Sequence, residues 1–163
     1  MQKTLIISTG GTFNKIYNPL NGELIIDKTS QALQSIASKW LCSFETLNII
    51  GKDSLEITDN DRAILLKFIM QSKHDRIVII HGTDTMDITA KYLAEKTINK
   101  HIVLTGAMVP YTIDPIEATA NLSASLGYIN ELNTHGIYIV MNGLFGKYDN
   151  IKKDRKKGFF YTI

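Results

Sequence analysis

The chain carries Thr4-Leu5-Ile6-Ile7-Ser8-Thr9-Gly10-Gly11-Thr12 near its start and Ile77-Val78-Ile79-Ile80-His81-Gly82-Thr83-Asp84-Thr85 in its middle. In both stretches a short apolar run rich in β-branched residues leads to a glycine-containing loop, which is typical of a buried parallel strand followed by a turn. Open α/β sheets bind ligands outside the carboxyl ends of their strands. We therefore expect the two loops to converge on one crevice and to bring Thr12, Thr83 and Asp84 together.

Further apolar runs extend this pattern along the chain. The strand candidates lie at residues 3–8, 46–50, 76–80, 101–105 and 136–141. Longer segments with helical periodicity separate them, so the strands must be joined by crossover connections. The sequence therefore predicts a single α/β domain over residues 1–163. Its mainly parallel sheet has helices on both faces and is flavodoxin- or Rossmann-like.

Four helices are expected between the strands. The first has Thr29 as its N-cap and ends near Trp40, and the second begins within Thr58–Asp61. The third runs from Asp84 to about Glu95, and the fourth runs from Pro115 to about Glu131. Proline is favoured at the first helical position because the missing N–H has no partner there. The buried faces are assigned to Ile64, Leu65, Phe68 and Ile69 in the second helix and to Ile88, Tyr92 and Leu93 in the third.

Residues 13–27 interrupt the alternation of strands and helices. Asn21-Gly22 is a strong hairpin-turn signal and precedes the apolar run Leu24-Ile25-Ile26. The hairpin follows Thr12 directly, which favours a mobile lid over the crevice. An ordinary surface hairpin is the alternative interpretation.

The composition limits the classes of function. The chain has 163 residues, 44% of them hydrophobic and 21% charged, which is typical of a folded domain with a sizeable core. A net charge of +2 gives no electrostatic case for nucleic-acid binding. No apolar stretch approaches the roughly 20 residues that span a bilayer, and no export signal is evident, so we expect no membrane partner and a cytoplasmic location. Cys42 is the single cysteine, which excludes an intramolecular disulfide, and we expect it to be a small buried hydrophobe.

Several polar residues have both a chemical and a structural interpretation. Thr12 is a candidate nucleophile, although its Thr-Gly-Gly-Thr setting is about as often a tight strand–helix turn. Thr83 and Asp84 suit a ligand site, and either could instead cap the helix that follows. The four histidines lack metal-ligand spacing, so no metal is expected, and His81 is interpreted as a support for its loop. Trp40 is assigned to the core, and the charged run Lys152–Lys157 is typical of a solvated surface.

Three motifs, in this order, resemble the N-terminal domain of the bacterial-type L-asparaginases. Thr9–Thr12 matches the family's TGGT, His81–Met86 matches HGTDTM, and Val103–Pro110 is similar to LTGAMRP, with Val109 in place of the usual arginine. The resemblance covers nearly the whole chain. It implies the family's α/β fold, an amino-acid amide substrate such as L-asparagine, and chemistry without a metal or cofactor.

The resemblance also implies roles for individual residues. Thr12 would attack the side-chain amide, and Thr83 would be the second catalytic hydroxyl. Asp84 would bind the substrate's α-amino group and complete a Thr–Lys–Asp group. Its lysine is Lys152 or Lys153, and we prefer Lys153. The remaining implied positions are Tyr17 as the lid tyrosine that helps to activate Thr12, Ser54 for the α-carboxylate, Ala107 in the amide pocket, and Gly11 beside the oxyanion.

Asparaginases of this type are about twice as long, and a neighbouring subunit's C-terminal half supplies an asparagine and a glutamate to the site. The sequence has no counterpart of that C-terminal domain. We expect a compact amidohydrolase with weak affinity or an altered amide substrate, assembled as a homodimer or higher homo-oligomer. The alternative is a non-catalytic module that binds aspartate, asparagine or a protein partner.

Overall fold

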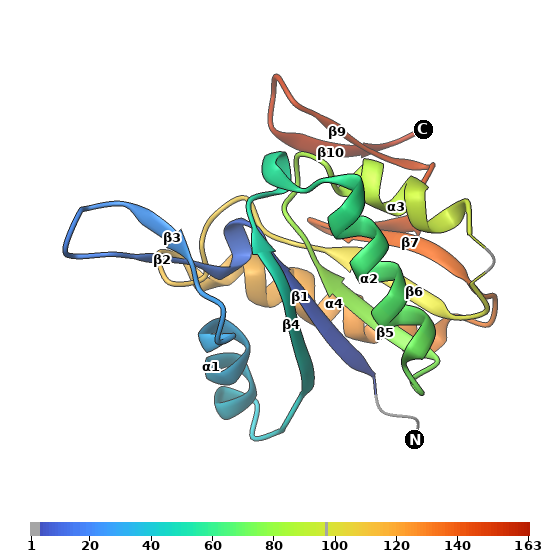
Figure 1. Ribbon diagram of the computed structural model, residues 1–163, viewed down its shortest axis with the longest axis horizontal. Coiled ribbons are helices and arrows are strands. Elements are labelled where there is room, and N and C mark those ends of the chain that lie inside the picture. Colours follow the sequence, from blue (N-terminus) through green and yellow to red (C-terminus); the bar gives the residue numbers. More distant parts are fainter. Residues whose placement is uncertain (1–3, 97) are drawn as a thin grey trace.

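A six-stranded sheet forms the centre of the molecule in the computed structural model, which describes residues 4–96 and 98–163 (Figure 1). The strand order is β4-β1-β5-β6-β7-β8, with all neighbours parallel except β7 and β8. The strands are β1 (Leu5–Gly10), β4 (Glu45–Lys52), β5 (Arg76–Ile80), β6 (His101–Thr105), β7 (Gly136–Met141) and β8 (Leu144–Lys147). The predicted α/β class is confirmed, and β4-β1-β5-β6-β7 is the flavodoxin-like order, which reverses direction at β1.

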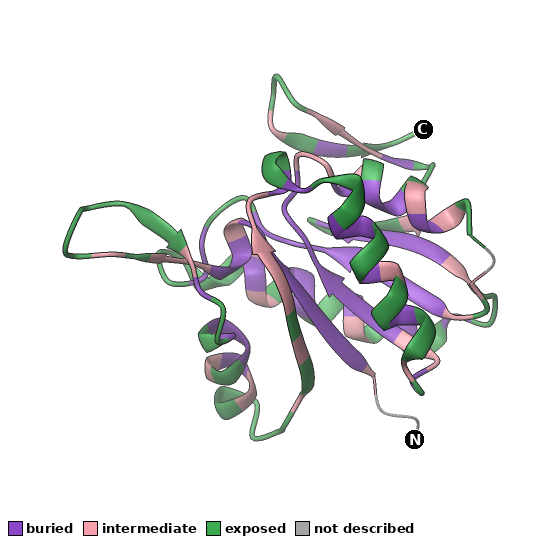
Figure 2. Cartoon of the chain, in the orientation of Figure 1, coloured by how far each residue is buried: buried purple, intermediate pink, exposed green. Residues whose placement is uncertain are grey.

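Helices cover both faces of the sheet, as predicted. They are α1 (Gln31–Lys39), α2 (Asp59–Gln71), α3 (Met86–Ala94) and α4 (Pro115–Glu131). Alternate residues of each strand enter separate cores: Ile77 and Ile79 pack with α2 and α3, whereas Val78 and Ile80 pack with α1 and α4. The central strands are therefore buried on both faces (Figure 2). This burial explains why their sequences are apolar runs rather than alternating patterns.

Two antiparallel hairpins stand outside the sheet. Strands β2 (Lys15–Tyr17) and β3 (Leu24–Ile26) form the predicted hairpin, which projects from the body as an arm (Figure 1). Strands β9 (Ile151–Asp154) and β10 (Phe159–Thr162) form the second, which lies beyond α3 at the end of the chain. Strands β8, β9 and β10 were not predicted: Gly146 interrupts the apolar pattern of β8, and β9 is mostly charged. Strand β10 is a run of only four residues near the end of the chain.

The first helix differs from its prediction at both ends. Its N-cap is Ser30 and not Thr29, because the Asp27 carboxylate accepts hydrogen bonds from the N–H groups of Thr29 and Gln31. Trp40 and Cys42, both expected inside, are exposed. They follow the last turn of α1, where the chain has left the sheet face and runs along the surface towards β4.

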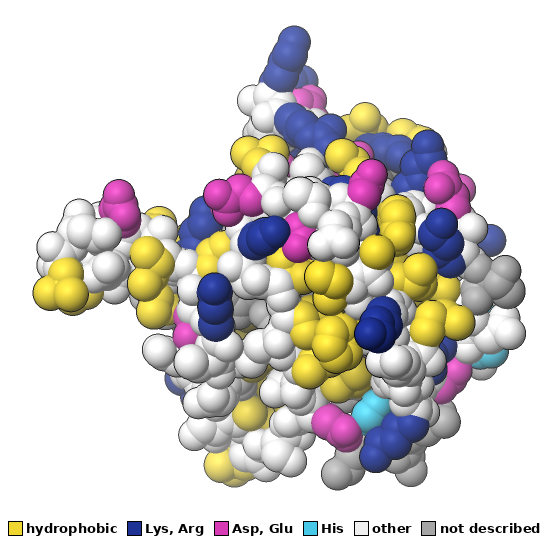
Figure 3. Space-filling view, viewed as in Figure 1, with side chains coloured by type: hydrophobic (Ala, Val, Ile, Leu, Met, Phe, Trp, Pro, Cys, Tyr) yellow, Lys and Arg dark blue, Asp and Glu magenta, His cyan; other side chains and the backbone are white. Residues whose placement is uncertain are grey.

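The buried faces of α2 and α3 are narrower than predicted. Leu65 and Ile69 are buried in α2, but Ile64 and Phe68 are more than one third exposed, and Ile88 in α3 is nearly half exposed. Figure 3 shows hydrophobic side chains reaching the surface on the face that carries α2. Across residues 4–96 and 98–163, no helix combines the length and apolar character needed to cross a membrane.

Adjacent residues of α2 offer a direct test of this packing. Leu65 is 1% exposed and Ile64 is 39% exposed. We expect Leu65→Ala to lower the free energy of unfolding by about 2–5 kcal/mol, because it leaves a cavity between α2 and the sheet. Ile64→Ala should cost less than about 1 kcal/mol. Urea unfolding of both variants measures the difference, and equal losses would contradict the assignment of the buried face.

Candidate functional site

The loops after β1 and β5 meet at the point where the strand order reverses. Strands β1 and β5 are parallel neighbours in which Ser8 pairs with Ile80, so the residues that follow them emerge side by side. A Cβ built on Gly11 would lie 2.5 Å from the Gly82 nitrogen. A Cβ on Gly82 would lie 2.5 Å from the Ser54 Cβ. Three segments distant in the sequence are therefore in direct contact, and glycine is required at both positions because any side chain would separate them.

Lys153 joins the C-terminal hairpin to the loop after β5. Its Nζ donates hydrogen bonds to the Thr83 hydroxyl at 2.8 Å and to an Asp84 carboxylate oxygen at 2.6 Å. The Lys153 side chain is 8% exposed and that of Asp84 is 40% exposed. Successive side chains of a strand point to opposite faces, so the neighbouring Lys152 cannot point the same way. The geometry thus selects Lys153 from the two lysines that the sequence left open.

Arg155, in the turn between β9 and β10, also binds the C-terminal hairpin to the segment that follows β5. Its guanidinium donates to the Asp84 carbonyl at 2.7 and 3.1 Å and to the Asp87 carboxylate at 3.0 Å. This arginine was predicted to belong to a solvated charge run. No sequence pattern singles it out, because it lies in the turn after β9 and not on the strand.

Thr12 begins the 3-10 turn Thr12–Asn14 directly after β1 and is partly exposed. The Gly11 backbone is in the left-handed region, at φ 75°, and its N–H donates to the Lys52 carbonyl at 3.0 Å. The Gly11 N–H is therefore engaged in holding β4.

The loop after β6 closes another side of the site. Ala107 is buried, and a Cβ on Gly106 would lie 2.3 Å from the His81 carbonyl oxygen, so this loop packs against the one after β5. The Glu117 carboxylate accepts the N–H groups of Met108 and Val109 at 2.9 and 3.0 Å. Met108 in turn places its sulfur 3.2 Å from the Thr83 hydroxyl. The sequence did not indicate Glu117 or Met108 as part of this site.

Ser54 is buried at the start of the short turn Ser54–Glu56. Its carbonyl accepts a hydrogen bond from the Thr85 hydroxyl at 2.7 Å, which ties this turn to the loop after β5. The preceding Asp53 forms an ion pair with Lys15 at 2.7 Å, and the hydrogen bond from Lys15 lowers the pKa of the Asp53 carboxyl. The base of the arm is thereby attached to the Ser54 turn.

Tyr17 lies on the arm and is 61% exposed. It is not in the group of side chains that the structure brings together around Thr83. The arm is attached at its base, whereas Leu20 at its tip is almost fully exposed (Figure 1). A Cβ built on Gly22 would lie 3.9 Å from the Tyr17 hydroxyl oxygen, so the tyrosine lies against the turn of the arm itself.

His81 supports the loop after β5, as predicted. Its Nδ1–H donates to the Gly82 carbonyl at 2.8 Å, and its Nε2 accepts from the Thr89 hydroxyl at 2.8 Å. Arg62 donates its Nε–H to the same hydroxyl, which completes a chain of hydrogen bonds from α2 to the loop. Burial lowers the pKa of His81 to about 4, so the imidazole is neutral near pH 7.

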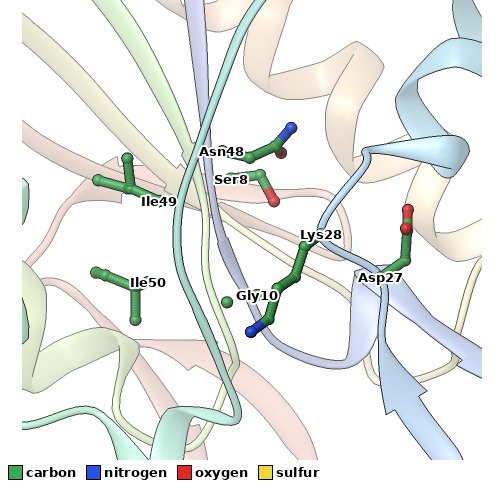
Figure 4. A pocket seen from close by; sticks show the side chains of 8 residues that line it. Ser8, Gly10, Asp27, Lys28, Asn48, Ile49 and Ile50 are labelled. Carbon is green, nitrogen blue, oxygen red and sulfur yellow. The ribbon is translucent and has the colours of Figure 1, made fainter.

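A separate hollow lies on the other side of β1 (Figure 4). It is lined by Ser8, Gly10, Asp27, Lys28, Asn48, Ile49, Ile50 and Gly51. Its hydroxyl group, that of Ser8, accepts a hydrogen bond from the Asn14 amide at 3.0 Å. The hollow contains no hydroxyl paired with a base, so the candidate chemistry belongs to the Thr83, Asp84 and Lys153 group.

Known proteins share this arrangement of sequence and fold. A family model described as "Asparaginase, N-terminal" matches residues 3–158. An L-asparaginase of Thermococcus kodakarensis is 32% identical over 143 residues, which cover 84% of this chain and 43% of that protein. A probable periplasmic L-asparaginase of Haemophilus influenzae is 31% identical, covering 84% of this chain and 42% of that protein.

Solved structures agree with the sequence matches. The thermostable L-asparaginase of Thermococcus kodakarensis superimposes with a TM-score of 0.85 at 28% identity, covering 99% of this chain and 51% of that one. A probable cytoplasmic L-asparaginase of Campylobacter jejuni gives a TM-score of 0.77 at 26% identity, covering 94% of this chain and 50% of that one. The chain thus spans about half the length of its relatives.

The buried, neutral His81 should make stability sensitive to acid. Its pKa falls from 6.5 in the unfolded chain to about 4 in the folded protein. The unfolded state therefore binds more protons between these values, and stability should decrease as the pH falls from 6.5 to 4. We expect His81 to contribute about 3 kcal/mol to this loss.

Urea unfolding at pH 7 and at pH 4.5 measures the effect. His81→Gln, which does not titrate in this range, should be less stable than the wild type at pH 7 and should lose less stability on acidification. An acid-induced loss of equal size in both proteins would contradict the prediction.

Proposed function

Because the chain belongs to the asparaginase family, we propose that it hydrolyses the side-chain amide of L-asparagine to L-aspartate and ammonia. The observation that carries this proposal is the buried Lys153, whose Nζ lies 2.8 Å from the Thr83 hydroxyl and 2.6 Å from Asp84. A lysine buried beside a hydroxyl is a sound arrangement for moving a proton during acyl transfer. A domain that served only as a scaffold would have no need to bury a lysine against these two side chains.

In the proposed reaction Thr12 is the nucleophile. Its oxygen forms a bond with the amide carbon, and its proton is transferred through the Thr83 hydroxyl to the Lys153 amine, which acts as the base in its neutral form. The C–N bond then breaks, the nitrogen takes up the proton returned by Lys153, and ammonia leaves an acyl-enzyme ester on Thr12. Water attacks that ester, restores the Thr12 hydroxyl and releases L-aspartate. Backbone N–H groups of the loops after β1 and β5 stabilise the oxyanion in both steps.

Substrate recognition uses the polar groups around these hydroxyls. Asp84 is partly exposed and gives one carboxylate oxygen to Lys153, so the second is proposed to bind the substrate's ammonium group. Ser54 would hold the α-carboxylate, and the Ala107 backbone would line the amide pocket. Tyr17 could assist Thr12 only after the arm bends towards the body, because the tyrosine is exposed in this conformation.

Assembly and location complete the proposal. We propose that the protein self-associates into a homodimer or larger assembly. We also propose a cytoplasmic location. The Campylobacter jejuni relative is called cytoplasmic and the Haemophilus influenzae relative periplasmic, so fractionation of the native cells is the direct test.

The first test is ammonia release from L-asparagine, with L-glutamine in parallel. Thr12→Ala should lower turnover by about 100-fold or more, because it removes the atom that forms the acyl-enzyme. Circular dichroism verifies that the variant is folded. Turnover equal to that of the wild type would exclude Thr12 as the nucleophile. Stabilisation by L-aspartate without ammonia release would favour the binding module.

The adjacent lysines provide a matched pair of variants. Lys153→Met should lower kcat by about 100-fold or more, whereas Lys152→Met should retain nearly full turnover, since only Lys153 contacts Thr83. Both changes remove one positive charge from the same strand and keep a long side chain. Equal losses in the two variants would show that charge on the hairpin, rather than a base at Thr83, is what matters.

A further inference from the structure

A second cluster of chemistry-bearing side chains lies at the opposite end of the sheet. Asp75 immediately precedes β5, His101 is the first residue of β6, and His135 immediately precedes β7. The three strands are parallel neighbours in which Arg76, His101 and Gly136 share a register. Their amino ends therefore meet at one edge, away from the carboxyl ends that carry Thr83 (Figure 1). The histidine spacing in the sequence gave no sign of this cluster.

The Asp75 carboxylate connects the two imidazole rings. One of its oxygens lies 2.9 Å from His101 Nδ1, and the other lies 3.3 Å from His135 Nε2. The ring centroids of the two histidines are 4.6 Å apart. One potential ligand atom from each residue lies within 4.8 Å of the other two. In a tetrahedral zinc site with bonds of about 2.0–2.1 Å, neighbouring ligand atoms lie about 3.3 Å apart. Small side-chain rotations would bring the three atoms to this spacing.

The burial of the cluster favours ion binding. His101 is buried, and its Nδ1 is held at Asp75. His135 is 48% exposed at its side chain, which leaves a path for an ion and a position for water as the fourth ligand.

Arg76 is a cation in contact with the cluster, and its position is compatible with a bound metal. Its guanidinium contacts an Asp75 oxygen at 3.3 Å and also donates to the carbonyls of Ile129 and Leu132. These carbonyls hold Arg76 in place. The Asp75 carboxylate can accept several partners at once, so its contact with Arg76 does not prevent it from binding an ion. Lys100 is directed elsewhere, since its Nζ donates to the Ser72 and His74 carbonyls.

We propose that Asp75, His101 and His135 form a binding site for a zinc ion. Two imidazole nitrogens and one carboxylate oxygen suit zinc, whereas magnesium and calcium prefer sites made entirely of oxygen. Such an ion links the starts of three adjacent strands. It therefore stabilises the folded domain from a place remote from the Thr83 and Lys153 group, independently of the proposed amidase activity.

Calorimetric titration of tag-free protein with zinc chloride tests the site. One ion should bind per chain, and zinc at about 100 times Kd should raise Tm by about 5–10 °C. Magnesium chloride should give neither effect. Cobalt(II) should produce the visible absorption bands of a four- or five-coordinate ion. Absence of zinc binding, or binding that leaves Tm unchanged, would overturn the proposal.

A pair of histidine variants assigns the ligands. His135→Ala, at an exposed position, should fold normally and weaken zinc binding by at least about 10-fold. His74→Gln is the matched control, because the His74 ring contacts Glu45 and lies outside the cluster. It should retain wild-type affinity. Ammonia release should be the same in His135→Ala and the wild type. Equal zinc affinity in His135→Ala and the wild type would rule out the assigned site.

Discussion

The close contact of Gly82 with Gly11 and Ser54 is the constraint on which the candidate site depends. At these positions the loops after β1, β4 and β5 approach so closely that no Cβ can be accommodated between them. The contact follows from the sheet order, since β1 has β4 on one side and β5 on the other. It brings Thr12 close to the Thr83 loop without requiring any side chain to bridge the gap. The hydrogen bonds of His81 with Gly82 and Thr89 then hold the loop after β5 in place.

The C-terminal hairpin contributes a basic group that contacts Thr83. Lys153 reaches Thr83 and Asp84, and Arg155 holds the Asp84 carbonyl from the following turn. The hairpin has no place in the central sheet, so its position depends on these polar contacts and on the buried Ile151 and Phe160. Burying a lysine is costly unless it is paired, and the carboxylate of Asp84 offsets that cost. The contacts that hold the hairpin in place are thus also the contacts of the candidate catalytic group.

The two polar clusters of the domain lie at opposite ends of the sheet. The carboxyl ends of β1 and β5 carry the hydroxyls and the lysine, whereas the amino ends of β5, β6 and β7 carry Asp75 and two histidines. Both groups are assembled from segments far apart in the sequence. In each case a parallel register places the starts, or the ends, of neighbouring strands in one row. The arrangement explains how a small domain can hold two unrelated polar clusters.

The sequence by itself determined the fold class, the five parallel strands, the four helices and the arm, because apolar runs, caps and turn residues act locally. It also predicted that the loops carrying Thr12 and Thr83 converge, and Gly11 and Gly82 of these loops are in contact. Only the tertiary structure selected Lys153 over Lys152 and revealed Arg155, Glu117 and the histidine cluster. Those contacts depend on which distant segments pack together. The exposure of Trp40, Cys42 and Phe68 was decided in the same way, because local periodicity does not show where a sheet face ends.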